Sequence, residues 1–233
     1  MSRDVWAVAW KEWKELFAPQ GRFRGGLVNF LLILAVFGVA MPWQLGRAWV
    51  ESPALLFAWA WVPLLMLSNL IVDAVAGERE RHTLETLLAS RLSDRAILVG
   101  KMAAAVGYGL AVLVGSLAVG LVTVNVLFAR GALVFYPLST LVGSAALAVL
   151  GATLTTAIGV LVSLRAASVR QASQQMGVAI LVVGLGPLLV LRAVSPSDPL
   201  ALGSVALACA ALLDAGLIAI ALSRFRRTRL VLD

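Results

Sequence analysis

The stretch ILVGKMAAAVGYGLAVLVGSLAVGLVTVNVLF, residues 97–128, decides the fold because it contains a single charged side chain, Lys101. A helix needs about 20 mostly apolar residues to cross the ~30 Å hydrocarbon core of a bilayer. The stretch is longer than that and almost wholly apolar. It therefore predicts a membrane-spanning helix.

The composition extends this prediction to the whole chain. Of the 233 residues, 61% are hydrophobic and 13% are charged. Soluble domains are closer to half apolar and a quarter charged. The apolar excess must face lipid, which argues against a soluble enzyme.

Several apolar segments are long enough to span, and the pattern predicts six spans in all. The fold class predicted is all-α, a polytopic membrane protein with one permease-sized transmembrane domain over residues 25–233. No segment between spans is long enough to form an independent soluble domain. The predicted spans are 27–41, 54–76, 97–128, 138–164, 174–192 and 199–223.

Residues 1–24 predict an amphipathic helix followed by a basic hinge. Trp6, Trp10, Trp13 and Phe17 recur at spacings of three and four, which places them on one helical face. The charged residues of this segment fall mainly on the other face. A helix of this kind lies in the membrane interface, parallel to the bilayer.

The positive charges predict the orientation. If the N-terminus is cytoplasmic, all of the 19 Lys and Arg residues except Arg47, Arg130 and Arg192 fall on the cytoplasmic side. Cytoplasmic loops carry such an excess. Both termini, including the basic tail 223–233, are therefore expected in the cytoplasm, with the chain in the cell's inner membrane. This distribution explains the net charge of +7 without a nucleic-acid partner.

Several kinds of site are disfavoured. The single cysteine, Cys209, and single histidine, His82, provide no disulfide, metal cluster or catalytic triad. A phosphate-binding loop needs G-x-x-x-x-G-K-[ST], but Met102 follows Gly100-Lys101. Lys101 instead predicts an anchor that extends its charge to the interface.

The connection 77–95, GERERHTLETLLASRLSDR, is the most informative loop. Leu84, Leu87, Leu88 and Leu92 fall on one helical face among charged residues. Ser93 or Asp94 is expected to cap the next helix. The segment is either a solvated loop that obeys the charge rule or a docking surface for a cytoplasmic partner.

The run ERERHTLETLL, residues 78–88, followed by Ser93 and Gly100-Lys101, resembles the signature of type 2 ABC exporter permeases. The run SLRAASVRQASQQ, residues 163–175, resembles a cytoplasmic connection of the sodium-efflux branch. The N-terminal helix resembles the family's connecting helix. This sequence has His82 where the family has glycine, and it lacks the usual proline near Arg91.

The resemblance implies a non-enzymatic permease that forms the translocation path and couples to a separate ABC ATPase. ATP and Mg are expected on that ATPase, with no cofactor on this chain. A second permease copy, giving a homodimer, and membrane lipids are the other expected partners. The segment 77–95 and the turn 164–173 would contact the ATPase through Glu78, Glu80, Thr83, Leu84, Glu85, Leu87, Leu88, Arg91, Arg165 and Arg170.

Two acidic residues lie within predicted spans. An aspartate at a helix centre costs ~2.5–3.5 kcal/mol on insertion scales, so Asp214 is expected to face the bundle interior, a partner or water. It either borders the translocation path or a subunit contact, or it forms a structural hydrogen bond. Asp73 is expected to pair with Arg79 or Arg81.

Small residues predict close helix contacts. Gly151, Thr155 and Gly159 are spaced by four, as are Ala103 and Gly107. Pro187 is expected to break the fifth span, with a re-entrant element over 184–199.

Two other functions remain open. A stand-alone secondary transporter or channel would have inverted 3+3 repeats, each interrupted by a proline, Pro63 or Pro187. A membrane enzyme would need a nucleophile and base, and no convincing set is present. The sequence does not indicate the substrate.

Overall fold

A computed structural model describes residues 2–17, 24–52, 62, 66–81, 83, 90–129, 131–193 and 199–225, and every structural statement below concerns these residues. The described chain is helical throughout its regular elements, with no β-strand among them. The predicted second span, 54–76, lies largely outside the described residues. Its described end is helical over 66–72 and continues into η2, a π-helical turn at Asp73–Gly77.

The longest element is α8, Asp94–Phe128, which confirms a helix over the predicted third span. It begins where Ser93 caps it, because the Ser93 hydroxyl accepts a hydrogen bond from the Ala96 amide at 3.2 Å. At 1.5 Å per residue, a helix of 35 residues is about 52 Å long. Because this exceeds the ~30 Å hydrocarbon core, part of α8 must extend beyond it or tilt strongly.

The first predicted span forms three consecutive helical pieces, α2 at Arg24–Ile33, the π-helical η1 at Leu34–Ala40 and α3 at Met41–Leu45. It ends later than predicted, because Pro42 stands in the first turn of α3, where a proline is tolerated. Gly46 then takes a φ of 57° and turns the chain into α4, Ala48–Glu51.

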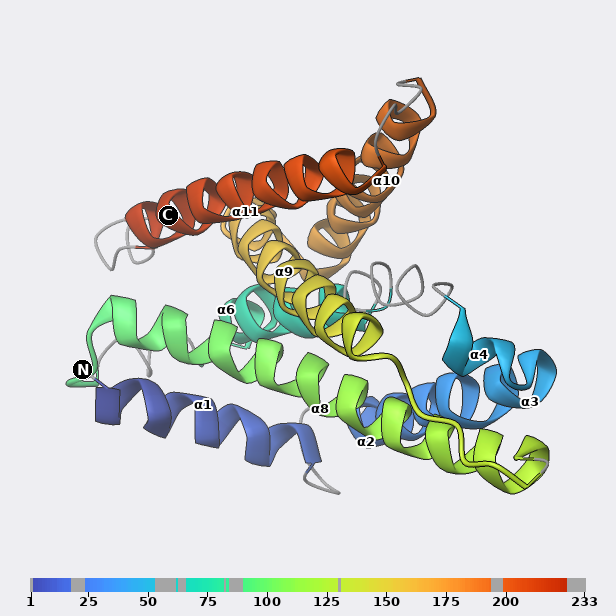
Figure 1. Cartoon of the computed structure of the whole chain (residues 1–233). Coiled ribbons are helices and arrows are strands. Elements are labelled where there is room, and N and C mark those ends of the chain that lie inside the picture. The colour runs from blue at the N-terminus through green and yellow to red at the C-terminus, as the bar shows by residue number, and fades with distance from the viewer. Residues whose placement is uncertain are drawn as a thin grey trace.

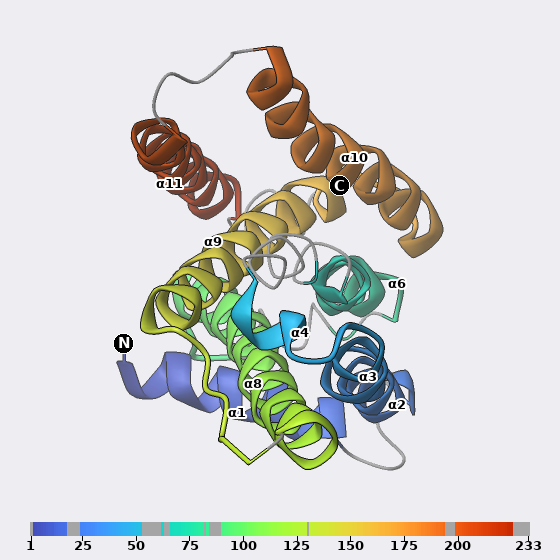
Figure 2. The same cartoon turned by 45° about the vertical axis from the view of Figure 1, so that its right-hand side comes forward.

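The helix α9, Leu138–Ser163, lies at the centre of the bundle. It packs against α8 and against the last two helices, α10 at Val169–Ala193 and α11 at Pro199–Arg224 (Figures 1 and 2). The expected break at Pro187 is wrong, since α10 stays helical through that residue. Of the predicted re-entrant segment, residues 194–198 lie outside the described ones.

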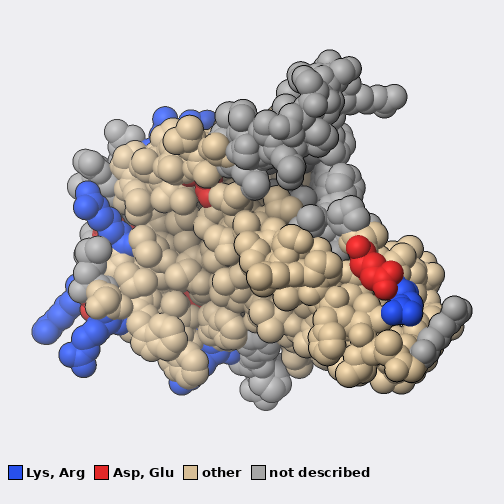
Figure 3. Space-filling view, in the orientation of Figure 1, with Lys and Arg blue, Asp and Glu red and all other residues tan. Residues whose placement is uncertain are grey.

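Three helical segments of the described chain are long and apolar enough to cross a membrane, namely Leu27–Leu45, Asp94–Phe128 and Leu138–Ser163. Six spans remain a prediction. Large apolar side chains cover much of the surface, and Val126 and Leu138, for example, are each about three-quarters exposed. Figure 3 shows a middle almost without charged residues, with Lys and Arg gathered mainly at one end. Lipid is the solvent that suits such a surface.

The loops sort into two ends of the bundle. At the charged end, α1 (Ser2–Phe17) lies along the first part of α8, and Phe225 after α11 packs with Ile97 and Leu98. The described chain therefore starts and finishes near the same end (Figure 1). At the opposite end, a Cβ atom at Gly46 would lie 3.6 Å from the Phe128 ring. This arrangement is the one that the charge pattern predicts.

Two side chains near the end opposite the charged one have structural roles. Trp49 is buried in the core, whereas Trp43 is exposed. Asn125 does not bridge two helices. Its side chain bonds to the Val134 amide and carbonyl, each at 2.8 Å, and so fixes the loop after α8.

The predicted close contact at Gly159 is confirmed. A Cβ atom there would lie 2.1 Å from Cγ2 of Ile71, so only glycine lets α9 approach the helix at 66–72 this closely. Thr155, four residues earlier, is fully buried.

Replacing Gly159 with alanine is therefore expected to destabilise the bundle by about 1–3 kcal/mol, the usual cost of overpacking. Gly177→Ala on α10 is the matched control, because its Cβ would meet no atom within 4 Å. Thermal unfolding in detergent should show a lower Tm for Gly159→Ala only. Equal Tm values for the two variants would contradict the close contact.

Candidate functional site

Three elements meet at the charged end around one buried ammonium group. Lys101 of α8 lies 2.7 Å from Glu12 of α1 and 2.8 Å from Glu78, measured from Nζ to the nearest carboxylate oxygen. Glu78 belongs to α6, the short helix Glu78–Glu80. All three residues are buried, and Lys101 and Glu78 are 2% and 1% exposed. We call them the buried ion cluster.

Lys11 balances the charge of the cluster from its partly exposed edge. Its Nζ lies 3.2 Å from Glu78, 3.4 Å from Glu12 and 3.2 Å from Glu15. Burial alone would lower the pKa of Lys11, but the charges of Glu12, Glu78 and Glu15 together raise it above its usual value. Lys11 therefore stays protonated at physiological pH and keeps the buried carboxylates paired.

The packing of α1 on α8 explains why these charges meet. Gly100 precedes Lys101, and a Cβ at Gly100 would lie 2.6 Å from Cβ of Val8. The backbone of α8 at Gly100 thus contacts the Val8 side chain of α1, and Val8, Ala9 and Leu16 are buried. Glu12 lies on this same face, away from Trp6 and Trp10 as the spacing predicts, but it is buried rather than exposed to water. The Lys101 charge is likewise buried rather than extended to an interface.

The residues after Glu78 connect α6 to the turn before α10. Arg79 donates a hydrogen bond to the Ala166 carbonyl, and the Glu80 carboxylate accepts one from the Val169 amide at 2.6 Å. Val169 is the first residue of α10, so Glu80 places a negative charge at a helix N-terminus, where it is favourable. The two connections expected to contact an ATPase therefore contact each other.

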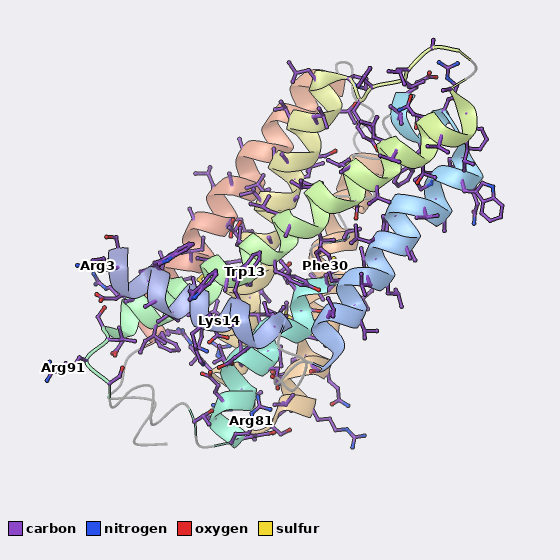
Figure 4. The ribbon with its side chains drawn as sticks, turned by 90° about the horizontal axis from the view of Figure 1, so that it is seen from below. Arg3, Trp13, Lys14, Phe30, Arg81 and Arg91 are labelled. Atoms are coloured by element: carbon purple, nitrogen blue, oxygen red, sulfur yellow. The ribbon has the colours of Figure 1, made fainter. Side chains whose placement is uncertain are left out.

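Arg81 fixes the other side of α6. Its guanidinium lies 2.9 and 3.0 Å from the two carboxylate oxygens of Asp73, which confirms one of the two expected pairings (Figure 4). Thr83 donates a hydrogen bond to the Glu78 carbonyl at 3.2 Å. The described part of the segment is thus held by α8, by η2 and by the start of α10.

The predicted coupling residues fall into three groups. Glu78 is buried, so its carboxylate cannot serve as the surface contact that the sequence suggested. The second group is exposed: Glu80, Thr83, Arg91, Arg165 and Arg170. Arg91 points away from the bundle (Figure 4). The third group lies outside the described residues: Leu84, Glu85, Leu87 and Leu88.

Sequence reasoning missed the buried ion cluster because its members are far apart in the chain. Spacing assigned Glu12 to a solvated face, and hydropathy made Lys101 an anchor. The available signal was the Gly100-Lys101 pair, since a glycine beside a lone lysine permits both close approach and charge pairing.

Asp214 faces the interior, as expected for a charge on an apolar helix. It is 6% exposed, and its Oδ2 accepts a hydrogen bond from the Thr153 hydroxyl of α9. The neighbouring Leu212 and Leu213 point outward and are largely exposed. Asp214 therefore links α11 to α9.

The fold and the charged end define the class of this protein, a multi-pass helical membrane protein. A family model described as ABC-2 family transporter protein matches residues 65–227, and the chain belongs to this family. Its members are membrane transport components that normally work with an ATPase partner. The match includes Glu78 and Lys101 but not Glu12. No curated protein sequence matches the chain.

The buried ion cluster yields a stability prediction. Lys101→Met is expected to lower the free energy of unfolding by about 3–5 kcal/mol, because two buried carboxylates lose their central partner. The triple variant Glu12→Gln, Glu78→Gln and Lys101→Met should recover much of the loss, since no buried charge stays unpaired. Chemical unfolding in detergent micelles measures both.

Arg95→Met is the control, because Arg95 is an exposed cation on the same helix. A Lys101→Met protein that is as stable as this control would show that the cluster contributes little to the fold.

Proposed function

We propose that the chain is the permease subunit of an ABC exporter of the type 2, sodium-efflux-like branch. It forms the translocation path and couples to a separate ATPase, which binds ATP and Mg. The observation that carries the proposal is the joined surface at the charged end, built from α6 and the turn before α10 in a chain of the ABC-2 family.

The joined surface suits a docking role because its outward residues are charged. Arg79 and Glu80 hold its two connections together. Arg91, Arg165 and Arg170 are exposed at or next to the two connections. Opposite charges on an ATPase would steer and orient its binding. Leu84, Leu87 and Leu88 would add an apolar stripe to this contact, with Glu85 and Thr83 beside it.

In this proposal Glu78 is a positioning residue. Its carboxylate joins α6 to Lys101 of α8, and Lys101 joins α8 to Glu12 of α1. Charge-assisted contacts are among the stronger polar interactions in proteins. A displacement of α6 by an ATPase would therefore move α1 and the long helix α8 with it.

The remaining parts of the proposal concern assembly and orientation. Two copies, each with six spans, would form a homodimer with two ATPases. Both termini and the coupling helices would lie in the cytoplasm, with the chain in the inner membrane and α1 in its interface. Asp214, held by Thr153, would border the path or the contact between copies.

The test is co-purification with candidate ABC ATPases in detergent, followed by reconstitution in lipid vesicles. A bound ATPase should hydrolyse ATP, and Arg91→Glu combined with Arg165→Glu should weaken binding at least several-fold. The physical reason is that both side chains are exposed on the proposed docking surface and take no part in the buried ion cluster.

Glu51→Lys is the matched control, since it reverses an exposed charge at the opposite end, where Glu51 pairs with Arg47. It should leave ATPase binding unchanged. Substrate transport by vesicles that contain this chain and no ATPase would overturn the proposal in favour of a stand-alone transporter.

A further inference from the structure

The helix α1 turns two of its tryptophans, Trp6 and Trp10, away from α8. Because Val8, Glu12 and Leu16 face α8, Trp6 and Trp10 are left 68% and 51% exposed. Their rings stack on each other, with centroids 6.1 Å apart. Two large exposed aromatic rings on one helix need an apolar neighbour, because exposed apolar patches mark interaction sites.

Beside these rings lies a groove between α1 and α8. Its volume is about 600 Å³, and its lining includes Trp6, Trp10, Trp13, Val5, Ala103 and Gly107. This volume lies within the ~300–1,000 Å³ of ordinary ligand sites. Gly107 leaves room for the Trp13 ring, because a Cβ atom at residue 107 would lie only 3.3 Å from it. The groove is lined mostly by apolar side chains and therefore suits an apolar ligand.

Two cations flank the groove. Arg3 and Lys14 share the helical face of Trp6 and Trp10, because residues three, four and seven apart along a helix lie on one side. The Lys14 ammonium lies 5.5 Å from the centroid of the Trp10 ring, and both cations are exposed (Figure 4). The ligand should then carry a negative charge at the end of an apolar chain.

The groove also opens at the right place for a lipid. It lies on the first part of α8, at the charged end, next to the exposed apolar surface that begins at Val99. Tryptophan favours the membrane interface, and basic residues there attract anionic lipids.

We propose that this groove binds one acyl chain of an anionic phospholipid, with the exposed cations Arg3 and Lys14 attracting its anionic headgroup. A second copy of this chain is the competing occupant. A two-fold contact between α1 helices would bring the two sets of cations together, because the same surface patch is used by both subunits. Like charges repel, so the groove favours lipid.

The test uses the purified chain in phosphatidylcholine vesicles and needs no ATPase, so its outcome is independent of the proposed function. Brominated-chain phosphatidylglycerol or brominated-chain phosphatidylcholine is added at low mole fraction, and tryptophan fluorescence is recorded. The fluorescence that is lost in the double variant Trp6→Phe, Trp10→Phe is the emission of these two tryptophans of α1. We expect phosphatidylglycerol to quench this signal at the lower mole fraction.

Two variants separate the chain from the headgroup. Ala103→Leu fills the groove from an exposed position and should reduce quenching by both lipids, whereas Ala146→Leu, exposed on α9, should not. Arg3→Gln with Lys14→Gln should remove the preference for phosphatidylglycerol. Each cation near an anionic surface contributes about five-fold, so the loss is at most roughly 30-fold. Arg95→Gln is the matched control.

Two results would overturn the proposal. One is equal quenching by both lipids with no effect of Ala103→Leu, which would indicate bulk lipid only. The other is efficient disulfide formation between two copies of Trp6→Cys in a Cys209→Ala background, which would show that a second copy covers the groove.

Discussion

The arrangement of the charged end depends on one interaction, the pairing of the Lys101 ammonium with the carboxylates of Glu12 and Glu78. A buried ion without partners costs several kcal/mol, so Glu12 and Glu78 each require Lys101 in place, and Lys101 requires their carboxylates. This requirement specifies how α1, α6 and α8 meet. Gly100 adds the steric condition, because α1 reaches Lys101 only where α8 has no side chain in the way.

From this pairing the contacts continue outward to the surface. Glu78 fixes α6, and its neighbours Arg79 and Glu80 then reach the turn before α10. Two connections that are far apart in the chain become one surface with exposed arginines. The same packing has a second consequence, since the face of α1 that holds Glu12 against α8 leaves Trp6 and Trp10 outside. The proposed docking surface and the apolar groove thus both depend on one helix contact.

The packing of the apolar helices depends on close steric fit and a hydrogen bond. Close approach at Gly159 and the hydrogen bond from Thr153 to Asp214 place α9 between its neighbours. The outward side chains of these helices are apolar because lipid, and not water, is their proposed solvent. Charged residues are therefore confined mainly to the two ends, and Asp214, within the bundle, accepts a hydrogen bond from Thr153.

The sequence by itself determined the helical membrane fold, the extents of the helices over 97–128 and 138–164, a cap at Ser93 or Asp94 and the close contact at Gly159. These depend on local hydropathy, spacing and residue size, which a sequence states directly. Only the tertiary structure decided the places of Glu12, Glu78 and Lys101, and which face of α1 is buried. Hydropathy assigns charges to water by default, whereas pairing between distant segments is a property of the packed chain.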